Sequence, residues 1–126
     1  MSMKIIISPA KKINNTQNKE NIRFSHCSFL NEATELIEIL KEFTPDELSK
    51  LMNISRNLSL LNADRYVNWS LPFNTKNSKQ AIISFAGDVY QGINIGDFDN
   101  NDLDFSQKHL RILSGLYGIL KPLDLI

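Results

Sequence analysis

The sequence predicts a mixed α/β fold of the α+β class, in the order strand, helices, strand and helix. Three observations predict it: a β-branched run at 3–7, apolar residues at helical spacing from Ser28 to Phe43, and a second apolar run at 81–85. Two strands are too few for an independently stable sheet. We therefore expect residues 1–126 to form one truncated domain, the N-terminal part of a larger fold.

The first predicted strand runs from Met3 to Ile7 and stops at Ser8-Pro9. Residues 8–23 are rich in lysine and asparagine and show no hydrophobic periodicity, which predicts a loop. Polar residues are thus expected at the carboxyl end of a buried strand, where ligands often bind in α/β proteins.

Three helices are predicted in the middle of the chain. The stretch Ser28–Phe43 alternates apolar residues at three- and four-residue steps with glutamates on the opposite face. The run Thr44–Glu47 has the signature of a capping box with proline at the first helical position, so a second helix should extend to about Met52. Ser55 is expected to cap a third helix, with Leu61 along one side.

The rest of the chain predicts a loop, a strand and a helix. Residues 71–78 are typical of a loop. The apolar run Ala81–Phe85 fits either a buried strand that enters a glycine turn or the end of a helix, and we expect the strand. Residues 99–113 predict a helix, because aspartates near its start would complement the helix dipole.

Composition excludes several classes of protein. The 14 basic side chains equal the 14 acidic ones, so net charge favours neither a nucleic-acid nor a membrane partner. No apolar stretch approaches the roughly 20 residues of a membrane-spanning helix. The apolar run after Lys4 is also too short for a signal peptide, and Cys27 is the only cysteine. We expect a cytoplasmic protein with no membrane partner.

Metal sites and cofactors are not expected. The acidic run 97–102 resembles the start of a calcium loop, but Asp102 stands where that loop needs glycine and Lys108 where it needs glutamate. His26, Cys27 and His109 lack the spacing of metal ligands.

Two short motifs follow the predicted strands. In SPAKK at 8–12, the hydroxyl of Ser8 and the ammonium of Lys11 can hold an anion or form a serine–lysine nucleophile pair, and the alternative is a solvated turn. In GDVYQG at 87–92, Asp88 can act as a general base, a metal ligand or a cap, and Tyr90 as a hydrogen-bond donor.

A third motif, LSGLYGIL at 113–120, contains Gly115 and Gly118. The cations around it are Lys108, Arg111 and Lys121. A glycine hairpin between two helices can offer backbone N–H groups to a phosphate, as in helix-hairpin-helix DNA binders. The alternative is a core helix that ends at one of the two glycines.

Four segments together resemble one known family. They are ISPAKK at 7–12, ISRNLSLLNADRY at 54–66, AIISFAGDVYQG at 81–92 and HLRILSGLYGILKPLD at 109–124. They occur in this order in the YaaA family of bacterial peroxide-stress proteins, and the resemblance covers the whole chain.

The resemblance implies a cytoplasmic protein that protects the cell from hydrogen peroxide, in part by limiting damage from free iron. It implies a mixed α/β fold, a basic cleft and a helix-hairpin-helix-like element, which would map to Leu113–Leu120, with Ser8–Lys12 as the strand-end loop. Members are about twice as long as this chain, which makes it the incomplete half of a larger YaaA-type fold. The resemblance establishes no catalytic activity, so the catalytic residues are unknown.

Two functions are expected. The first is sequence-independent DNA binding that protects DNA from peroxide and free-iron damage. Its phosphate-binding residues would be Ser8, Lys11, Lys12, Lys108, Arg111, Gly115, Gly118 and Lys121. The alternative is an enzyme for a phosphorylated or nucleotide-like small molecule, with Ser8 and Lys11 on the anion and Asp88 and Tyr90 as acid and base.

A third, blander interpretation makes the chain only a structural half-domain. Surface exposed by truncation would favour association with other chains.

Overall fold

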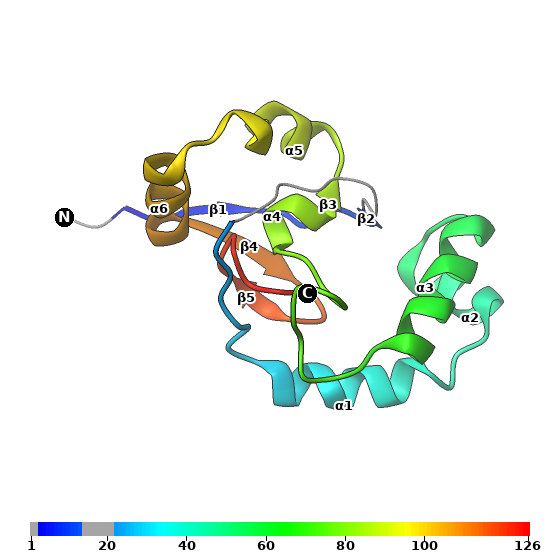
Figure 1. The fold of residues 1–126 in the computed structure, drawn as a ribbon. Helices are drawn as coiled ribbons and strands as arrows, with labels where there is room; N and C mark the ends of the chain where they lie inside the picture. Colours follow the sequence, from blue (N-terminus) through cyan, green and yellow to red (C-terminus); the bar gives the residue numbers. More distant parts are fainter. Residues whose placement is uncertain (1–2, 14–21) are drawn as a thin grey trace. The chain divides into compact units, whose positions relative to one another are not determined.

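The computed structural model describes residues 3–13 and 22–126 (Figure 1). Contacts divide these residues into two compact units: the residues up to Phe29 together with Phe73–Ile126, and Leu30–Pro72. Strands and helices mix in the first unit, whereas the second unit is helical. The α+β class predicted from the sequence is confirmed. A single truncated domain stays a prediction.

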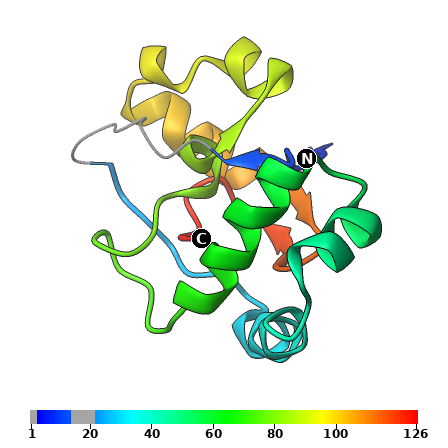
Figure 2. The ribbon, with the colours of Figure 1, turned by 90° about the vertical axis from the view of Figure 1, so that its right-hand side faces the viewer.

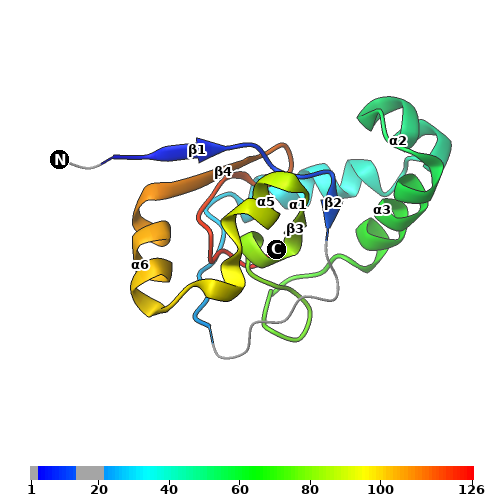
Figure 3. The same ribbon diagram turned by 90° about the horizontal axis from the view of Figure 1, so that it is seen from above.

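The first unit contains a three-stranded sheet with the order β1-β4-β5. Its strands are β1 (Ile5–Ile7), β4 (Leu110–Ser114) and β5 (Gly118–Leu120). β1 is parallel to β4 and runs beside it in Figure 3, and β5 is antiparallel to β4. Ile7 pairs with Ile112 and Ile112 with Leu120, so these side chains share one face of the sheet. Ile112 and Leu120 are fully buried, which makes this face part of the core.

A two-stranded antiparallel ladder joins β2 (Lys12–Ile13) to β3 (Phe85–Ala86). The loop predicted for residues 8–23 is therefore interrupted by a strand, and its part at 14–21 lies outside the described residues.

The strand predicted for Ala81–Phe85 is mostly wrong. Ala81–Ser84 forms a short helix, α4, and only Phe85 and Ala86 belong to β3. All four residues of α4 are buried, so the run has no polar side whose period could separate a helix from a strand. The C-terminal segment decides the outcome, because the carbonyls of Pro122 and Asp124 accept hydrogen bonds from the N–H groups at the start of α4.

The helix predicted for 99–113 is correct only up to His109. α6 spans Asn100–His109 and begins with a capping box in which Asp99 and Asp102 each accept the other's backbone N–H, at 2.8 and 3.0 Å. From Leu110 the chain is β4, the central strand of the sheet. Pairing on both sides of Leu110–Ser114 overrides the local helical pattern.

Between β3 and α6 lie α5 (Asp88–Ile93) and the 3₁₀ helix η1 (Ile95–Asp97). One core cluster of aliphatic side chains joins α4, η1, α6 and the C-terminal segment, and α5 packs against it through Ile93. Its buried members are Ile82, Ile83, Ile95, Leu103 and Leu123. This cluster fixes α5 and therefore the motif that begins at Gly87.

The second unit consists of α1 (Leu30–Leu40), α2 (Pro45–Met52) and α3 (Arg56–Asn68), and α2 lies against α3 (Figure 2). The caps predicted at Thr44 and Ser55 are confirmed, since each side chain accepts a backbone N–H from three residues ahead. The backbone N–H of Thr44 bonds in return to Glu47, and these hydrogen bonds hold the pKa of the Glu47 carboxyl below its usual value. Leu61 is exposed, and α3 buries Ser59 and Asn62 instead.

Candidate functional site

Two of the sequence motifs converge in the first unit. Lys12 of the SPAKK loop pairs with Ala86, directly before Gly87. On the other side of the loop, the hydroxyl of Tyr90 donates a hydrogen bond to the carbonyl oxygen of Ser8 at 2.6 Å. The structure therefore brings Ser8–Lys12 and Phe85–Gly92 together, and we call these two segments the strand-end junction.

Gly87 gives the junction a backbone that other residues do not adopt. Its φ of 141° and ψ of 178° lie in a region open almost only to glycine. A Cβ on Gly87 would also lie 3.9 Å from the Cβ of Ala10, so the two segments are in van der Waals range. Glycine here lets β3 turn into α5 directly beside the SPAKK loop.

Tyr90 of α5 holds the two segments of the junction together. Its side chain is only 8% exposed, and its ring lies 5.5 Å from the ring of Phe85. Burial raises the pKa of Tyr90 to about 12, so the hydroxyl keeps its proton and donates it to the Ser8 carbonyl. In this arrangement the hydroxyl predicted for acid–base work is engaged with the backbone.

The polar side chains of the junction that face solvent are those of Ser8, Lys11, Lys12, Asp88 and Gln91. Ser8 leaves the end of β1, and Asp88 is the first residue of α5. A hydroxyl and two ammonium groups on one exposed loop can attract an anion, while the Asp88 carboxylate would oppose an anion close to Gly87. The SPAKK side of the junction is therefore its anion-attracting side.

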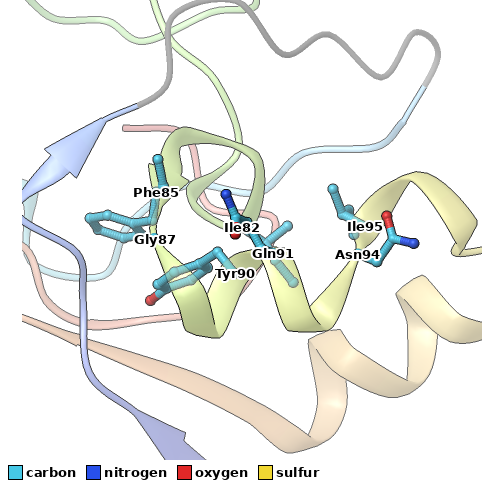
Figure 4. Close-up of a pocket in the computed structure, with 8 residues that line it drawn as sticks. Ile82, Phe85, Gly87, Tyr90, Gln91, Asn94 and Ile95 are labelled. Atoms are coloured by element: carbon cyan, nitrogen blue, oxygen red, sulfur yellow. The ribbon is translucent and has the colours of Figure 1, made fainter.

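A pocket of about 220 Å³ adjoins the junction (Figure 4). The rings of Phe85 and Tyr90 line it on one side, and the amides of Gln91 and Asn94 on the other. The Tyr90 hydroxyl points away from these amides. Aromatic rings and side-chain amides are groups that line binding sites for planar polar molecules.

The second predicted group of residues is arranged differently. Leu113–Leu120 is a β-hairpin between β4 and β5, so the predicted helix-hairpin-helix-like element is wrong. Neither does a helix end at either glycine. Gly118 has a φ of 73°, and an added Cβ would lie 3.0 Å from Cδ2 of Phe29. Three residues connect the strands, and a left-handed residue next to such a loop is typical of hairpins.

Arg111 serves the end of α6. Its guanidinium donates hydrogen bonds of 2.7 Å to the carbonyls of Gln107 and Leu110, and Lys4 donates to the carbonyl of Lys108. The last carbonyls of a helix carry partial negative charge and lack partners within it. These two cations therefore have a structural use at this site.

The predicted cations do not form one cluster. Lys108 lies before the start of β4, while Lys11 and Lys12 follow the end of β1, which is parallel to β4. The two groups lie at opposite ends of the sheet, separated by about 10 Å of strand. Lys121 follows the last residue of β5, beyond the pair Ile112–Leu120 and thus on the side of Arg111.

Cys27 is poorly placed for reaction with peroxide. The thiol is buried and donates to the carbonyl of Leu125 at 3.2 Å. Burial, and then the neighbouring Asp124 carboxylate, raise the pKa of Cys27 to about 12, and the reactive form of a cysteine is the thiolate. Among residues 3–13 and 22–126, no group of three or more His, Cys, Asp or Glu side chains could hold a metal ion.

A buried polar cluster around Asp124 is absent from the sequence-based predictions. The Asp124 carboxylate accepts hydrogen bonds from the Ser25 hydroxyl at 2.5 Å and from the Lys121 N–H at 2.9 Å. Gln107 joins the cluster by donating to Ser25 and accepting from the N–H of Leu123. Because these groups satisfy one another, the cluster fixes the C-terminal segment. An aspartate inside the apolar run 122–125 is the signal that could have indicated it.

Comparisons with known proteins support one family. The family model described as "Peroxide stress protein YaaA" matches residues 3–126. A UPF0246 protein of Teredinibacter turnerae is 48% identical over 124 residues, which are 98% of this chain and 48% of that protein. UPF0246 proteins of Cellvibrio japonicus and Pseudoalteromonas translucida are 47% and 46% identical over 96% of this chain and 47% of theirs.

The chain thus spans about half the length of the curated relatives it matches. Within the part of the chain that the structure describes, no helix combines the length and the apolar character needed to cross a membrane.

Proposed function

The chain belongs to the YaaA family of peroxide stress proteins, and we propose that it protects DNA from hydrogen peroxide and free-iron damage by binding the phosphate backbone without sequence preference. Such a role belongs in the cytoplasm, where bacterial DNA is found. The observation that carries the proposal is the strand-end junction, whose anion-attracting side presents Ser8, Lys11 and Lys12 to solvent.

The proposal assigns the phosphate contacts to the SPAKK loop. Lysine ammonium groups on an exposed loop bind phosphates as point charges and read no sequence. Lys108 is exposed at the other end of the sheet, and a linear polyanion can reach both groups, whereas one small phosphate can reach only one. Contacts from Arg111, Gly115, Gly118 and Lys121 stay predictions.

The test is the affinity of the protein for a labelled DNA duplex as a function of salt. We expect log K to fall linearly with log salt concentration, and the slope to decrease by about two in the double variant Lys11→Ala/Lys12→Ala. Lys50→Ala/Lys76→Ala, which removes two exposed lysines elsewhere, is the charge-matched control and should keep the slope. An affinity that ignores salt, or an equal loss in both double variants, would contradict DNA binding through this loop.

A second candidate is an enzyme for a phosphorylated or nucleotide-like small molecule. The convergence of the SPAKK loop with Gly87 and the adjoining pocket favours it. Ser8 and Lys11 would hold the anion, and Asp88 would be the group available as a base, because Tyr90 donates to the backbone.

This candidate predicts saturable stabilisation by a small ligand. A compound at 100 times its Kd should stabilise the fold by about 2.7 kcal/mol, which a thermal-shift panel of nucleotides and sugar phosphates detects. The shift should disappear in Ser8→Ala and persist in Ser70→Ala, a solvent-exposed serine of the other unit. A panel without any shift would remove the second candidate and leave the DNA proposal intact.

A further inference from the structure

The two faces of the three-stranded sheet differ in burial. One face carries Ile112 and Leu120, which are fully buried. The other carries Ile6, Leu113 and Ile119, whose side chains are 62%, 45% and 51% exposed. We call this second face the outer sheet face.

The exposed aliphatic side chains of the outer sheet face are neighbours. Leu113 pairs with Ile119 across β4 and β5. Ile6 of β1 pairs with Arg111, which is the side chain next to Leu113 on the same face of β4. Directly opposed side chains lie about 5 Å apart and diagonal ones about 7–8 Å. The three side chains therefore form one patch rather than scattered exposed residues.

A solvent-facing sheet does not usually look like this. Antiparallel sheets with one wet face alternate apolar and polar residues, whereas β5 reads Gly118-Ile119-Leu120 and is apolar on both faces. In addition, β1 pairs with β4 alone among the described strands, which leaves its other edge open. An apolar sheet face and edge left open to water would promote association. These features indicate an interface.

We propose that the outer sheet face docks the part of a YaaA-family chain that the curated relatives carry outside the matched residues. The matched region is 48% of the Teredinibacter protein and 47% of the Cellvibrio protein, so the remaining part is as large as this chain and can cover a sheet face. This inference does not depend on the proposed DNA binding.

The charges of the outer sheet face disfavour a second copy as the occupant. Arg111 lies on this face, Lys121 lies next to it, and the face carries no acidic residue. A symmetric dimer through the same patch would bring these cations close to their own copies, and like charges repel. The occupant should therefore be an apolar surface bordered by acidic side chains.

The test joins this chain to the segment that the Teredinibacter protein carries outside its matched region and measures the thiol reactivity of single cysteine variants. Ile119→Cys reports on the outer sheet face, and Val67→Cys, at a position 67% exposed on α3, is the matched control. Both introduced thiols should react quickly with a maleimide in the 126-residue chain, because both positions are exposed. The native Cys27 is buried and should add little to the measured rate. In the fusion, the rate at Ile119→Cys should fall at least tenfold and the rate at Val67→Cys should not change.

Three results would overturn the inference. The first is an Ile119→Cys rate in a cooperatively folding fusion that equals that of the 126-residue chain. The second is protection of Ile119→Cys in the 126-residue chain that grows with its own concentration, which would assign the face to a second copy. If the fusion does not fold, the segment is co-expressed as a separate tagged chain, and failure to co-purify with the 126-residue chain is the third.

Discussion

The hairpin Leu110–Leu120 and the strand-end junction are alike in sequence and different in use. Both combine apolar residues with glycines and cations. In the hairpin, Gly118 adopts the positive φ that the turn needs, and Arg111 donates a hydrogen bond to a carbonyl at the end of α6. In the junction, Gly87 and Tyr90 hold the backbone, while Ser8 and Lys12 face solvent. The hairpin therefore builds the fold, whereas the junction leaves polar groups exposed to solvent, where the proposed ligand would bind.

The largest expected effect tests the structural part of this comparison. Ile112→Ala should lower the free energy of unfolding by about 3 kcal/mol, because Ile112 is fully buried at the centre of the sheet. Ile6→Ala changes the same residue type in the neighbouring strand, where the side chain is exposed, and should cost less than about 1 kcal/mol. Urea unfolding measures both, and equal costs would contradict the difference between the two sheet faces.

The two hairpin glycines allow a sharper test. Gly118→Ala should destabilise by about 1–2 kcal/mol, since a Cβ is strained at a φ of 73° and would press on Phe29. At Gly115 no atom outside the neighbouring residues of the chain lies within 4 Å of an added Cβ, so Gly115→Ala should stay within about 0.5 kcal/mol of the wild type. If thermal melts rank the two variants the other way round, the β-hairpin assignment is wrong.

In the junction, Tyr90→Phe should cost about 1 kcal/mol at neutral pH by removing the hydrogen bond to the Ser8 carbonyl. It should also change the response to alkali. The pKa of Tyr90 is raised from 10.0 to about 12, so the folded state binds this proton more tightly than the unfolded state. The stabilisation is complete below pH 10 and is lost as the pH rises through 12.

Denaturant unfolding from pH 8 to 12 measures this effect. The decline above pH 10 should be shallower in Tyr90→Phe than in the wild type. Cys27, whose pKa is raised to about 12, and Tyr66, whose pKa is raised by burial, contribute in both proteins. Identical alkaline slopes would show that Tyr90 does not hold its proton as described. Tyr66→Phe, a change in α3, removes a part-buried hydroxyl that donates to the Met52 sulfur and leaves the hydrogen bond to Ser8 in place, so it compares the two tyrosines.

Removing a cation from the hairpin and removing one from the junction should differ by a smaller amount in the free energy of unfolding. Arg111→Ala should cost about 0.5–1 kcal/mol, because the last carbonyls of α6 lose a cationic donor. Lys12→Ala, on the exposed loop, should change stability by less than about 0.5 kcal/mol. Calorimetry at low salt gives the difference, and a larger loss in Lys12→Ala would assign that lysine to the fold rather than to a ligand.

The smallest expected effect is at Cys27. Native protein incubated with hydrogen peroxide should show no added oxygen at this residue by mass spectrometry, because the thiol is buried and its pKa is raised. Protein unfolded in urea provides the positive control and should be oxidised. Rapid oxidation in the native state would contradict the burial of Cys27 and its raised pKa.

Much of the local structure was predictable. Thr44 and Ser55 begin their helices as expected, because a capping side chain needs only backbone groups three residues away. The β-branched run before Ser8 has a high local preference for a strand, and it is one, although its partner β4 lies about 100 residues later. The two motifs of the junction were also identified, although their contact through Tyr90 was not.

Other features depended on partners far along the chain. Leu110–Ser114 continues a helical pattern but becomes a strand, since β1 lies more than 100 residues earlier and pairs with it. Ala81–Ser84 becomes a helix because it is bonded to the C-terminal segment. No local pattern contains either partner, so local propensity could not decide these elements.

The sequence by itself determined the helix caps, the residues at the end of the first strand and the family to which the chain belongs. The tertiary structure decided that Gly118 and Arg111 support a β-hairpin, that Tyr90 fastens the SPAKK loop, and that Ile6, Leu113 and Ile119 share one exposed face. The physical reason is range: caps act over three residues, whereas strand pairing and burial join residues about a hundred positions apart.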